Sequence, residues 1–170
     1  MCGCAPTTSW RGQQENNSSN NRFYHSTIRK INPYPIVLLC SANRKVPHPA
    51  PALELYRSEF FRLGRSFAQS FSPKKIYILS AEHGLVAGEQ ELVPYTMTMS
   101  ALAKEGDVKV WAKLIVDQLR EEIDLHQYEV IVLGLRKFAQ PIADALPHAQ
   151  APLVGMNMPQ AMNYLRERFN

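Results

Sequence analysis

The sequence has no long hydrophobic run, which argues against a membrane-spanning helix. Its longest uninterrupted apolar stretch covers residues 36–40, whereas a helix needs about 20 apolar residues to cross a bilayer. The chain has 170 residues, of which 45% are hydrophobic and 20% are charged, as in ordinary globular domains. We therefore expect no membrane partner.

Cysteine is also scarce, because the chain holds only Cys2, Cys4 and Cys40. Three thiols cannot all pair within one chain, and this usage is typical of cytoplasmic proteins. The N-terminus has no basic segment followed by an apolar run of the kind that a secretory signal requires. The sequence thus predicts a cytoplasmic protein.

The usual metal and phosphate motifs are missing as well. The sequence contains no H-E-x-x-H, no C-x-x-C and no carboxylates clustered at metal-ligand spacing. It contains neither G-x-x-x-x-G-K-S/T nor G-x-G-x-x-G, so it does not support an NTPase or a dinucleotide-dependent enzyme. We expect no metal and no cofactor.

The excess positive charge lies near the N-terminus. Of the net charge of +4, residues 1–34 carry four cations and one anion, which leaves fifteen basic and fourteen acidic residues in 35–170. Residues 1–34 are rich in Ser, Thr, Asn and Gln, which predicts a disordered extension. Residues 35–170 then form a single domain, whose near-neutral charge favours a small substrate over a long duplex.

Apolar patterns within 35–170 predict an α/β fold. Continuous apolar runs at 35–40, 75–79 and 128–133, with a shorter one at 152–155, are typical of strands covered on both faces. Apolar residues spaced by three or four predict helices over 51–71, over 108–125 and from 159 onward, with Asn157 as a cap. This alternation indicates a three-layer fold, in which a mostly parallel sheet of about four strands has helices on both faces.

The loops that follow the predicted strands are the first candidates for a site, because ligands of such sheets bind outside the strand carboxyl ends. These loops cover residues 40–45, 80–85 and 134–137 and hold most of the reactive side chains. Cys40, Lys45 and His83 lie in them, and Ser58 lies near the start of the first helix. We expect these four residues to surround one cleft.

The first loop places a thiol beside cations. Arg44 and Lys45, or the amides of a tight turn, would lower the pKa of the Cys40 thiol from about 8.5 and activate it as a nucleophile. The loop also suits an anion-binding turn that includes Ser41. The simpler interpretation is that Cys40 is the buried last residue of a hydrophobic strand.

The second loop supplies Glu82 and His83, followed by Gly84, which permits turns that other residues resist. His83 suits general acid or base catalysis near neutral pH, and Glu82 suits orienting His83 or taking a proton itself. The simpler interpretation is a structural histidine. The third loop adds Gly134 and Arg136.

Taken in order, these motifs resemble a known family. They are Cys40-Ser41-x-x-x-Lys45, Pro51-Ala52-x-x-Leu55-Tyr56-x-Ser58-x-x-Phe61, Ile78-Leu79-Ser80-Ala81-x-His83-Gly84-Leu85, Pro94-Tyr95 and Pro152-Leu153-x-Gly155-Met156. The pattern resembles a family of small bacterial and phage proteins catalogued as a domain of unknown function, over residues 35–170. It departs from that family where three residues, rather than two, separate Ser41 from Lys45. Either Arg44 takes the role of the lysine or the turn is one residue longer.

More distantly, the Cys-Ser element with its basic residue and aromatic-Ser element is similar to the core domain of archaeosine synthase, which acts on a deazaguanine in tRNA. A looser similarity is to the YaaA-like peroxide-stress proteins, which have been linked to DNA binding. These resemblances imply a nucleobase, nucleotide or nucleic acid as substrate or partner.

We therefore predict an enzyme that acts on such a substrate in a cleft at the strand carboxyl ends, with Cys40, Lys45, Glu82 and His83 as catalytic residues. The residues expected to bind the substrate are Ser41, Arg44, Tyr56, Ser58, Ser80, Gly84, Tyr95, Gly134 and Arg136. One alternative is a non-catalytic nucleic-acid or nucleotide-binding module in stress response or phage defence. Another alternative is a protein-interaction domain.

Overall fold

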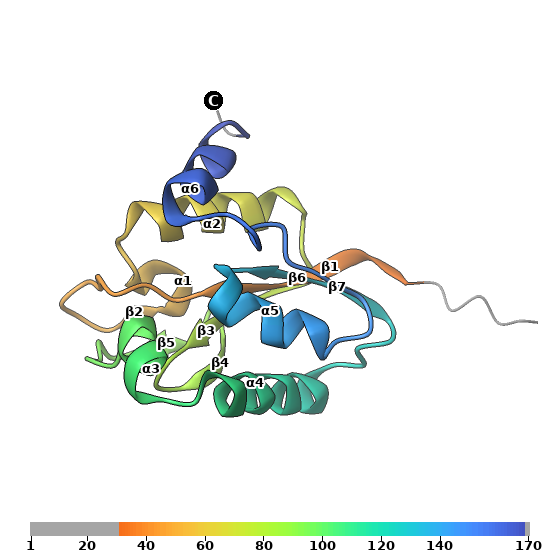
Figure 1. The fold of residues 1–170 in the computed structure, drawn as a ribbon, viewed down its shortest axis with the longest axis horizontal. Helices are drawn as coiled ribbons and strands as arrows, with labels where there is room; N and C mark the ends of the chain where they lie inside the picture. Colours follow the sequence, from red (N-terminus) through yellow and green to blue (C-terminus); the bar gives the residue numbers. More distant parts are fainter. Residues whose placement is uncertain (1–30, 169–170) are drawn as a thin grey trace, which may run out of the picture.

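A central sheet organises the chain, whose computed structural model describes residues 31–168 (Figure 1). The sheet has five strands in the order β4-β3-β1-β6-β7. All neighbours pair in parallel except β3 and β4, which are antiparallel. The predicted α/β fold with a mostly parallel sheet is confirmed. The strand bounds are β1 Asn32–Cys40, β3 Lys75–Ser80, β4 Gly84–Ala87, β6 Tyr128–Leu133 and β7 Ala149–Gln150.

Helices cover both faces of this sheet: α2 and α6 lie against one face, and α4 and α5 lie against the other (Figure 1). Side chains alternate along β1, so that Ile36 and Leu38 enter the core on the α4 side while Val37 and Leu39 enter the core on the α2 side. Burying each such side chain contributes about 1.5–3 kcal/mol, which explains why β1 is an unbroken apolar run. The helix bounds are α2 Glu59–Ser70, α4 Val108–Glu122, α5 Arg136–Asp144 and α6 Met158–Arg166.

Side-chain caps begin three of these helices. The Ser58 hydroxyl oxygen accepts from the Phe61 amide at 3.2 Å to cap α2, and the Asp107 carboxylate caps α4. Asn157 caps α6 as predicted, in a reciprocal arrangement with Gln160. Each such cap contributes about 1 kcal/mol and defines where its helix starts.

Four short elements lie at the end of the sheet where β1 finishes (Figure 1). Strands β2 and β5 pair with each other in a separate antiparallel ladder. Helix α1 precedes α2, and helix α3 precedes α4. These elements are β2 Ala50–Pro51, α1 Ala52–Leu55, β5 Glu91–Leu92 and α3 Met99–Glu105.

The prediction of one helix over 51–71 is wrong, because the chain leaves the helical conformation between α1 and α2. Tyr56 is extended, with φ of −97° and ψ of 134°, and it forms an isolated antiparallel bridge with Lys45. Ser58 then starts a new helix as its cap. The apolar spacing continues through the break, so periodicity alone did not reveal it.

The prediction of a strand at 152–155 is also wrong. These residues form turns, in which Gly155 has a φ of 93° that favours glycine. The strand beside β6 is instead β7, which pairs through Val130 with Ala149 and through Ile131 with Gln150. At the other end, β1 begins at Asn32, before the predicted boundary at 35, and the rest of the predicted extension, residues 1–30, lies outside the described residues.

The chain changes direction around β1. After β1 the chain forms β3 on one side of it, and β6 later pairs on the other side. The boundary between β1 and β6 is therefore the topological switch point of the sheet, where α/β proteins bind ligands. No helix within residues 31–168 combines the length and the apolar character needed to cross a membrane.

Candidate functional site

A pocket of about 390 Å³ opens at the switch point, at the carboxyl ends of β1 and β6. Four helices begin at its rim: Ser58 is the cap of α2, Met99 is the first residue of α3, Leu135 precedes α5, and Met158 is the first residue of α6. The partial positive charge of helix N-termini favours anions at such a rim. The lining residues are Cys40, Ser41, Ala42, Asn43, Arg44, Ser58, Phe60, Met99, Ser100, Leu135, Phe138 and Met158.

The wall of this pocket is mostly apolar. It is formed by side chains of two aromatic residues, Phe60 and Phe138, together with two methionines and a leucine. Phe138 packs edge-on against Trp111 with ring centroids 6.1 Å apart, which holds it in place. The polar lining comes from serines, Asn43 and Arg44. Within the described part of the chain, no acidic residue lines the pocket.

Cys40 ends β1 at the floor of the pocket and is only 6% exposed. Burial raises the pKa of its thiol to about 12, which opposes formation of a thiolate. The side chain packs so closely on Gly134 that a Cβ atom at position 134 would overlap the Cys40 Sγ atom. The geometry thus favours the simpler interpretation of Cys40 as a packed strand residue.

A second group of side chains lies on the β3 side of the end of β1, and we call Tyr56, Ser80, Tyr95 and Lys45 the tyrosine cluster. The hydroxyl oxygens of Tyr56 and Tyr95 are 2.6 Å apart. Ser80 donates to the Tyr95 hydroxyl at 2.8 Å. The cluster thus joins the end of β3 to the turn before α2 and to the segment after β5.

Ser80 is the buried polar centre of this cluster, with no exposed surface. Its hydroxyl oxygen accepts from the backbone amides of Glu82 at 3.2 Å and His83 at 3.0 Å. Its carbonyl oxygen accepts from the Trp111 indole at 2.9 Å. Ser80 therefore fixes the tight turn into β4 as well as the position of Tyr95.

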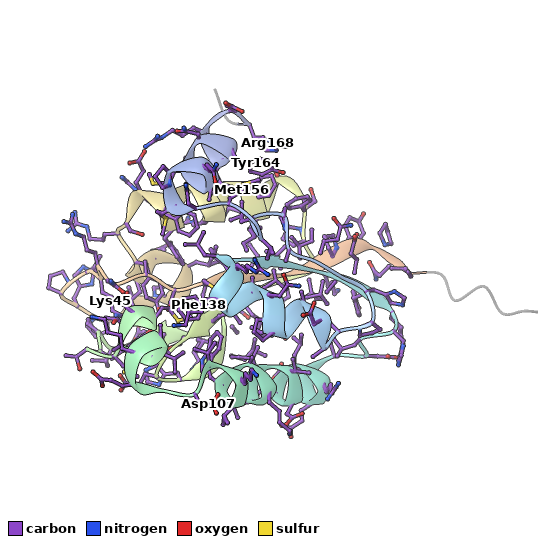
Figure 2. All side chains as sticks on the ribbon, viewed as in Figure 1. Lys45, Asp107, Phe138, Met156, Tyr164 and Arg168 are labelled. Carbon is purple, nitrogen blue, oxygen red and sulfur yellow. The ribbon has the colours of Figure 1, made fainter. Side chains whose placement is uncertain are left out.

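Lys45 extends over the aromatic faces of the cluster. Its Nζ atom lies 4.0 Å from the ring centroid of Tyr95 and 5.7 Å from that of Tyr56, within the range of cation–π attraction. Burial lowers the pKa of Lys45, and the negative charge of Glu82 partly opposes this shift. Figure 2 shows Lys45 and Phe138 toward the end of the sheet where β2 and α3 lie.

Tyr56 links the cluster to the pocket. Its phenol lies close enough to Ser41, which lines the pocket, for the Ser41 hydroxyl to donate to it. Burial, together with the interaction with Tyr95, raises the pKa of Tyr56, while the hydrogen bond with Ser41 acts in the opposite direction. Tyr56 is thus a neutral phenol at physiological pH, with one hydrogen to donate.

Glu82 and His83 are exposed residues of the turn between β3 and β4. The His83 ring meets the Tyr95 ring edge-on, with centroids 4.8 Å apart. Gly84 follows with a φ of 71°, and a Cβ atom there would lie 2.5 Å from the Gln118 Oε1 atom. The positive φ of the turn therefore favours glycine at position 84, and a larger residue there would displace the Gln118 side chain of α4.

The predicted residues fall into two adjoining groups rather than one cleft. Cys40, Ser41, Arg44 and Ser58 line the pocket. Tyr56, Ser80, Tyr95, Lys45 and His83 belong to the tyrosine cluster or contact it. Gly134 packs on Cys40, and Arg136 is an exposed residue at the start of α5.

Sequence reasoning missed most of the apolar wall. Phe60 lies two residues after the predicted Ser58, and Phe138 directly follows the third loop. Their positions near the strand carboxyl ends could therefore have indicated both as lining residues. Met99 and Ser100 come from α3, which no periodic pattern revealed. The lining residues absent from the predicted site are Ala42, Asn43, Phe60, Met99, Ser100, Leu135, Phe138 and Met158.

Within residues 31–168 no group of three or more His, Cys, Asp or Glu side chains is arranged to hold a metal ion. Apart from the buried Cys40 thiol, the polar lining of the pocket consists of hydroxyl, amide and guanidinium groups, which are hydrogen-bonding groups rather than the usual ligands of a transition metal. The arrangement is therefore suited to binding an organic ligand through apolar contact and hydrogen bonds.

Comparisons with known proteins place the chain in a family without naming an activity. No curated protein and no solved structure matches the sequence. A family model does match, over residues 36–167, which include both the pocket and the tyrosine cluster. The chain belongs to DUF6884, a family of unknown function.

Proposed function

We propose that the protein binds a nucleobase or nucleotide in the pocket between β1 and β6. The observation that carries this proposal is the pocket itself, an apolar and aromatic cavity of about 390 Å³ at the switch point. Small-molecule sites typically enclose about 300–1,000 Å³, with mostly apolar walls and a few polar groups. A flat heteroaromatic ring suits the wall that includes Phe60 and Phe138.

Charge supports the same class of ligand. Arg44 lines the pocket, and within the described chain no acidic residue does. The positive charge of Arg44 would therefore attract a negatively charged ligand, and no lining carboxylate would repel it. Nucleotides combine a flat base with an anionic group. A cytoplasmic location belongs to this proposal, since nucleotides are abundant there and Cys40 is a free thiol.

Calorimetric titration of the full chain with the common nucleobases, ribonucleosides and ribonucleoside 5′-monophosphates tests the proposal. We expect at least one of these compounds to bind, and Phe138→Ala to weaken its binding about tenfold or more, since base stacking on an aromatic ring is worth about 1–3 kcal/mol. Leu114→Ala is the matched control, because Leu114 is 48% exposed on α4 and does not line the pocket. If none binds, or both variants bind alike, the proposal is wrong.

A catalytic role is a second candidate, favoured by the state of Lys45. Burial lowers the pKa of this amine, and His83 with Glu82 lies on the neighbouring turn, so the edge of the cluster holds groups suited to proton transfer. Incubation of the protein with each ligand that binds, followed by mass spectrometry, would reveal a product. Lys45→Met should abolish its formation while leaving ligand affinity within about threefold.

The two non-enzymatic alternatives remain distinguishable from ligand binding in the pocket. Residues 35–170 hold nearly equal numbers of acidic and basic residues, whereas binding to nucleic acid depends on several cations that neutralise phosphates. Fluorescence anisotropy with single-stranded and duplex oligonucleotides should therefore show weak binding. Tight, salt-dependent binding that Phe138→Ala does not affect would favour a nucleic-acid module, and a protein-interaction domain would bind neither class.

A further inference from the structure

Two arginines lie side by side at the mouth of the pocket. Lys45 and Tyr56 form an isolated antiparallel bridge, and one step further along the two segments the Arg57 amide donates to the Arg44 carbonyl at 2.9 Å. Residues that oppose each other in this way have Cβ atoms about 4.5–5.5 Å apart and project from the same face of the pair. Arg44 and Arg57 are therefore nearest neighbours across the two segments.

The bridge separates these arginines from the tyrosine cluster. Successive side chains of an extended segment point to opposite faces, and Lys45 and Tyr56 belong to the cluster. Arg44 lies on the other face, where it lines the pocket. Arg57 shares that face because it lies opposite Arg44, but it is not a lining residue. Arg57 therefore extends the rim of the pocket outward.

Neither guanidinium has a partner within the described chain. Both residues are exposed, and none of the ion pairs or side-chain hydrogen bonds within residues 31–168 involves either side chain. Glu59, two residues after Arg57, is held by Arg166 at 2.7 Å. Because like charges directly opposite each other are destabilising, the fold itself gains nothing from placing these two cations together.

The other arginines show that this lack of partners depends on the place in the fold. Away from the pocket, Arg65 donates to the Leu53 carbonyl, and Arg120 forms an ion pair with Asp117. Within the described chain the arginines without any such partner are Arg44, Arg57, Arg62 and Arg136. All of these except Arg62 lie beside the pocket, since Arg136 directly follows the lining residue Leu135. Unpaired guanidiniums thus gather where the proposed ligand enters.

We propose that the Arg44–Arg57 pair is the phosphate subsite of the pocket, and that it selects a phosphate monoester over a phosphodiester. This inference rests on the proposed function and narrows its ligand class to mononucleotides with a free phosphate. Such a phosphate carries about −1.5 to −2 charges at neutral pH and three acceptor oxygens. This charge matches two guanidiniums, each of which can donate two parallel hydrogen bonds. A diester has a single negative charge, so it balances only one of the arginines.

The test compares a ribonucleoside, its 5′-monophosphate and the methyl ester of that monophosphate, for each of adenosine, guanosine, cytidine and uridine. Calorimetric titration of the full chain should show that at least one monophosphate binds more tightly than its nucleoside and its methyl ester. Arg57→Gln should reduce this advantage about tenfold, as expected for the loss of a charge-assisted hydrogen bond to phosphate. The affinity for the nucleoside should change by less than about twofold.

Lys74→Gln is the matched control. Lys74 is an exposed cation without a side-chain partner in the described chain, and it precedes β3 at the opposite edge of the sheet. This variant removes the same charge and should leave the advantage of the monophosphate within about twofold. Three outcomes would overturn the inference while leaving the pocket as a nucleoside site: equal losses in the two variants, an unchanged advantage in Arg57→Gln, or equal affinities for the monophosphate and its methyl ester.

Stability separates a binding role of Arg57 from a structural one. Because removing one of two opposed cations relieves their repulsion, Arg57→Gln without ligand should unfold at low salt at the temperature of the parent or about 1–3 °C above it. Arg44→Gln repeats the measurement on the opposite segment. A clear fall in the unfolding temperature of both variants would show that the arginines support the fold, and it would overturn the inference.

Inorganic phosphate distinguishes failure of this inference from failure of the proposed function. If no nucleoside or nucleotide binds, the proposed function fails, and inorganic phosphate is titrated into the isotope-labelled full chain while the amide signals of residues 44–46 and 58–60 are followed. Saturable shifts that are lost in Arg57→Gln and kept in Lys74→Gln would sustain the arginine pair as a site for another phosphate monoester. Absence of shifts, or shifts that Arg57→Gln does not affect, would remove both proposals.

Discussion

On the β6 side of the end of β1 lies a mostly apolar pocket with a few polar groups in its lining, whereas on the β3 side lies a tyrosine cluster whose hydroxyls bond to one another. Ser41 belongs to both sides, as lining residue of the pocket and partner of Tyr56. The difference indicates that the cluster contributes rigidity, whereas the pocket offers a surface to a ligand. Substitutions in the two regions should therefore affect different measurable quantities.

The largest expected effect concerns the reactivity of the Cys40 thiol, which the nucleophile hypothesis requires to be high. Burial raises its pKa to about 12, which lowers the thiolate fraction at neutral pH roughly a thousandfold relative to an unperturbed thiol. In the Cys2→Ser/Cys4→Ser background, native protein should resist iodoacetamide at pH 7, with modification measured by mass spectrometry. The urea-unfolded chain is the control and should react at once, and equally rapid alkylation of the native protein would restore Cys40 as a nucleophile.

Removing the polar centre of the cluster should cost more stability than any change in the pocket. Ser80→Ala leaves two backbone amides and the Tyr95 hydroxyl without their partner, which should reduce the free energy of unfolding by about 2–3 kcal/mol. Ser100→Ala, at an exposed pocket position, should change it by less than about 0.5 kcal/mol. Urea titration followed by circular dichroism measures both, and equal effects would erase the distinction between the regions.

The floor that supports the pocket offers a test of packing. Gly134→Ala introduces a Cβ atom that overlaps the Cys40 Sγ atom, and overpacking of this kind costs about 1–3 kcal/mol. Cys40→Ala removes the sulfur and should suppress most of this loss in the double variant. The midpoint of thermal unfolding is measured for the parent, the two single variants and the double variant. A Gly134→Ala variant as stable as the parent would contradict the close contact.

The smallest effect concerns the charge state of Lys45. Its pKa should lie below the usual value of about 10.4, as measured by nuclear magnetic resonance of the side chain across a pH series. Glu82→Gln removes the opposing negative charge and should lower the pKa further. Because burial disfavours the protonated amine, the unfavourable contribution of Lys45 to stability should diminish as pH rises through its folded pKa toward the unfolded value. A Lys45 pKa at or above the usual value in the parent protein would contradict this prediction.

The long strands were predictable because a strand that is buried on both faces is a continuous run of apolar residues. β1, β3 and β6 are continuous apolar runs, and their burial explains why. β7 has only two residues, of which Gln150 is exposed, so it carries no comparable pattern. The break between α1 and α2 was hidden because Tyr56 is buried in the core although its backbone is extended, so the apolar spacing looks helical across the break.

The candidate site was predictable only where it follows a strand. Ser41, Arg44 and Ser58 were found because the loop after β1 and the start of α2 must lie at the carboxyl edge. Met99 and Met158 reach the pocket from segments far away in the sequence, and their position depends on how α3 and α6 pack. The partition into pocket and cluster depends likewise on tertiary contacts such as that between Tyr56 and Tyr95, which no local pattern specifies.

The central place of β1 in the sheet has a consequence for how the protein is made. β1 ends at Cys40, but its partner β6 ends only at Leu133, so one side of the most buried strand has no partner until most of the chain has been synthesised. At a translation rate of about 5–20 residues per second, this delay is on the order of 5–20 s. During that interval a nascent chain leaves one apolar edge of β1 without its partner strand.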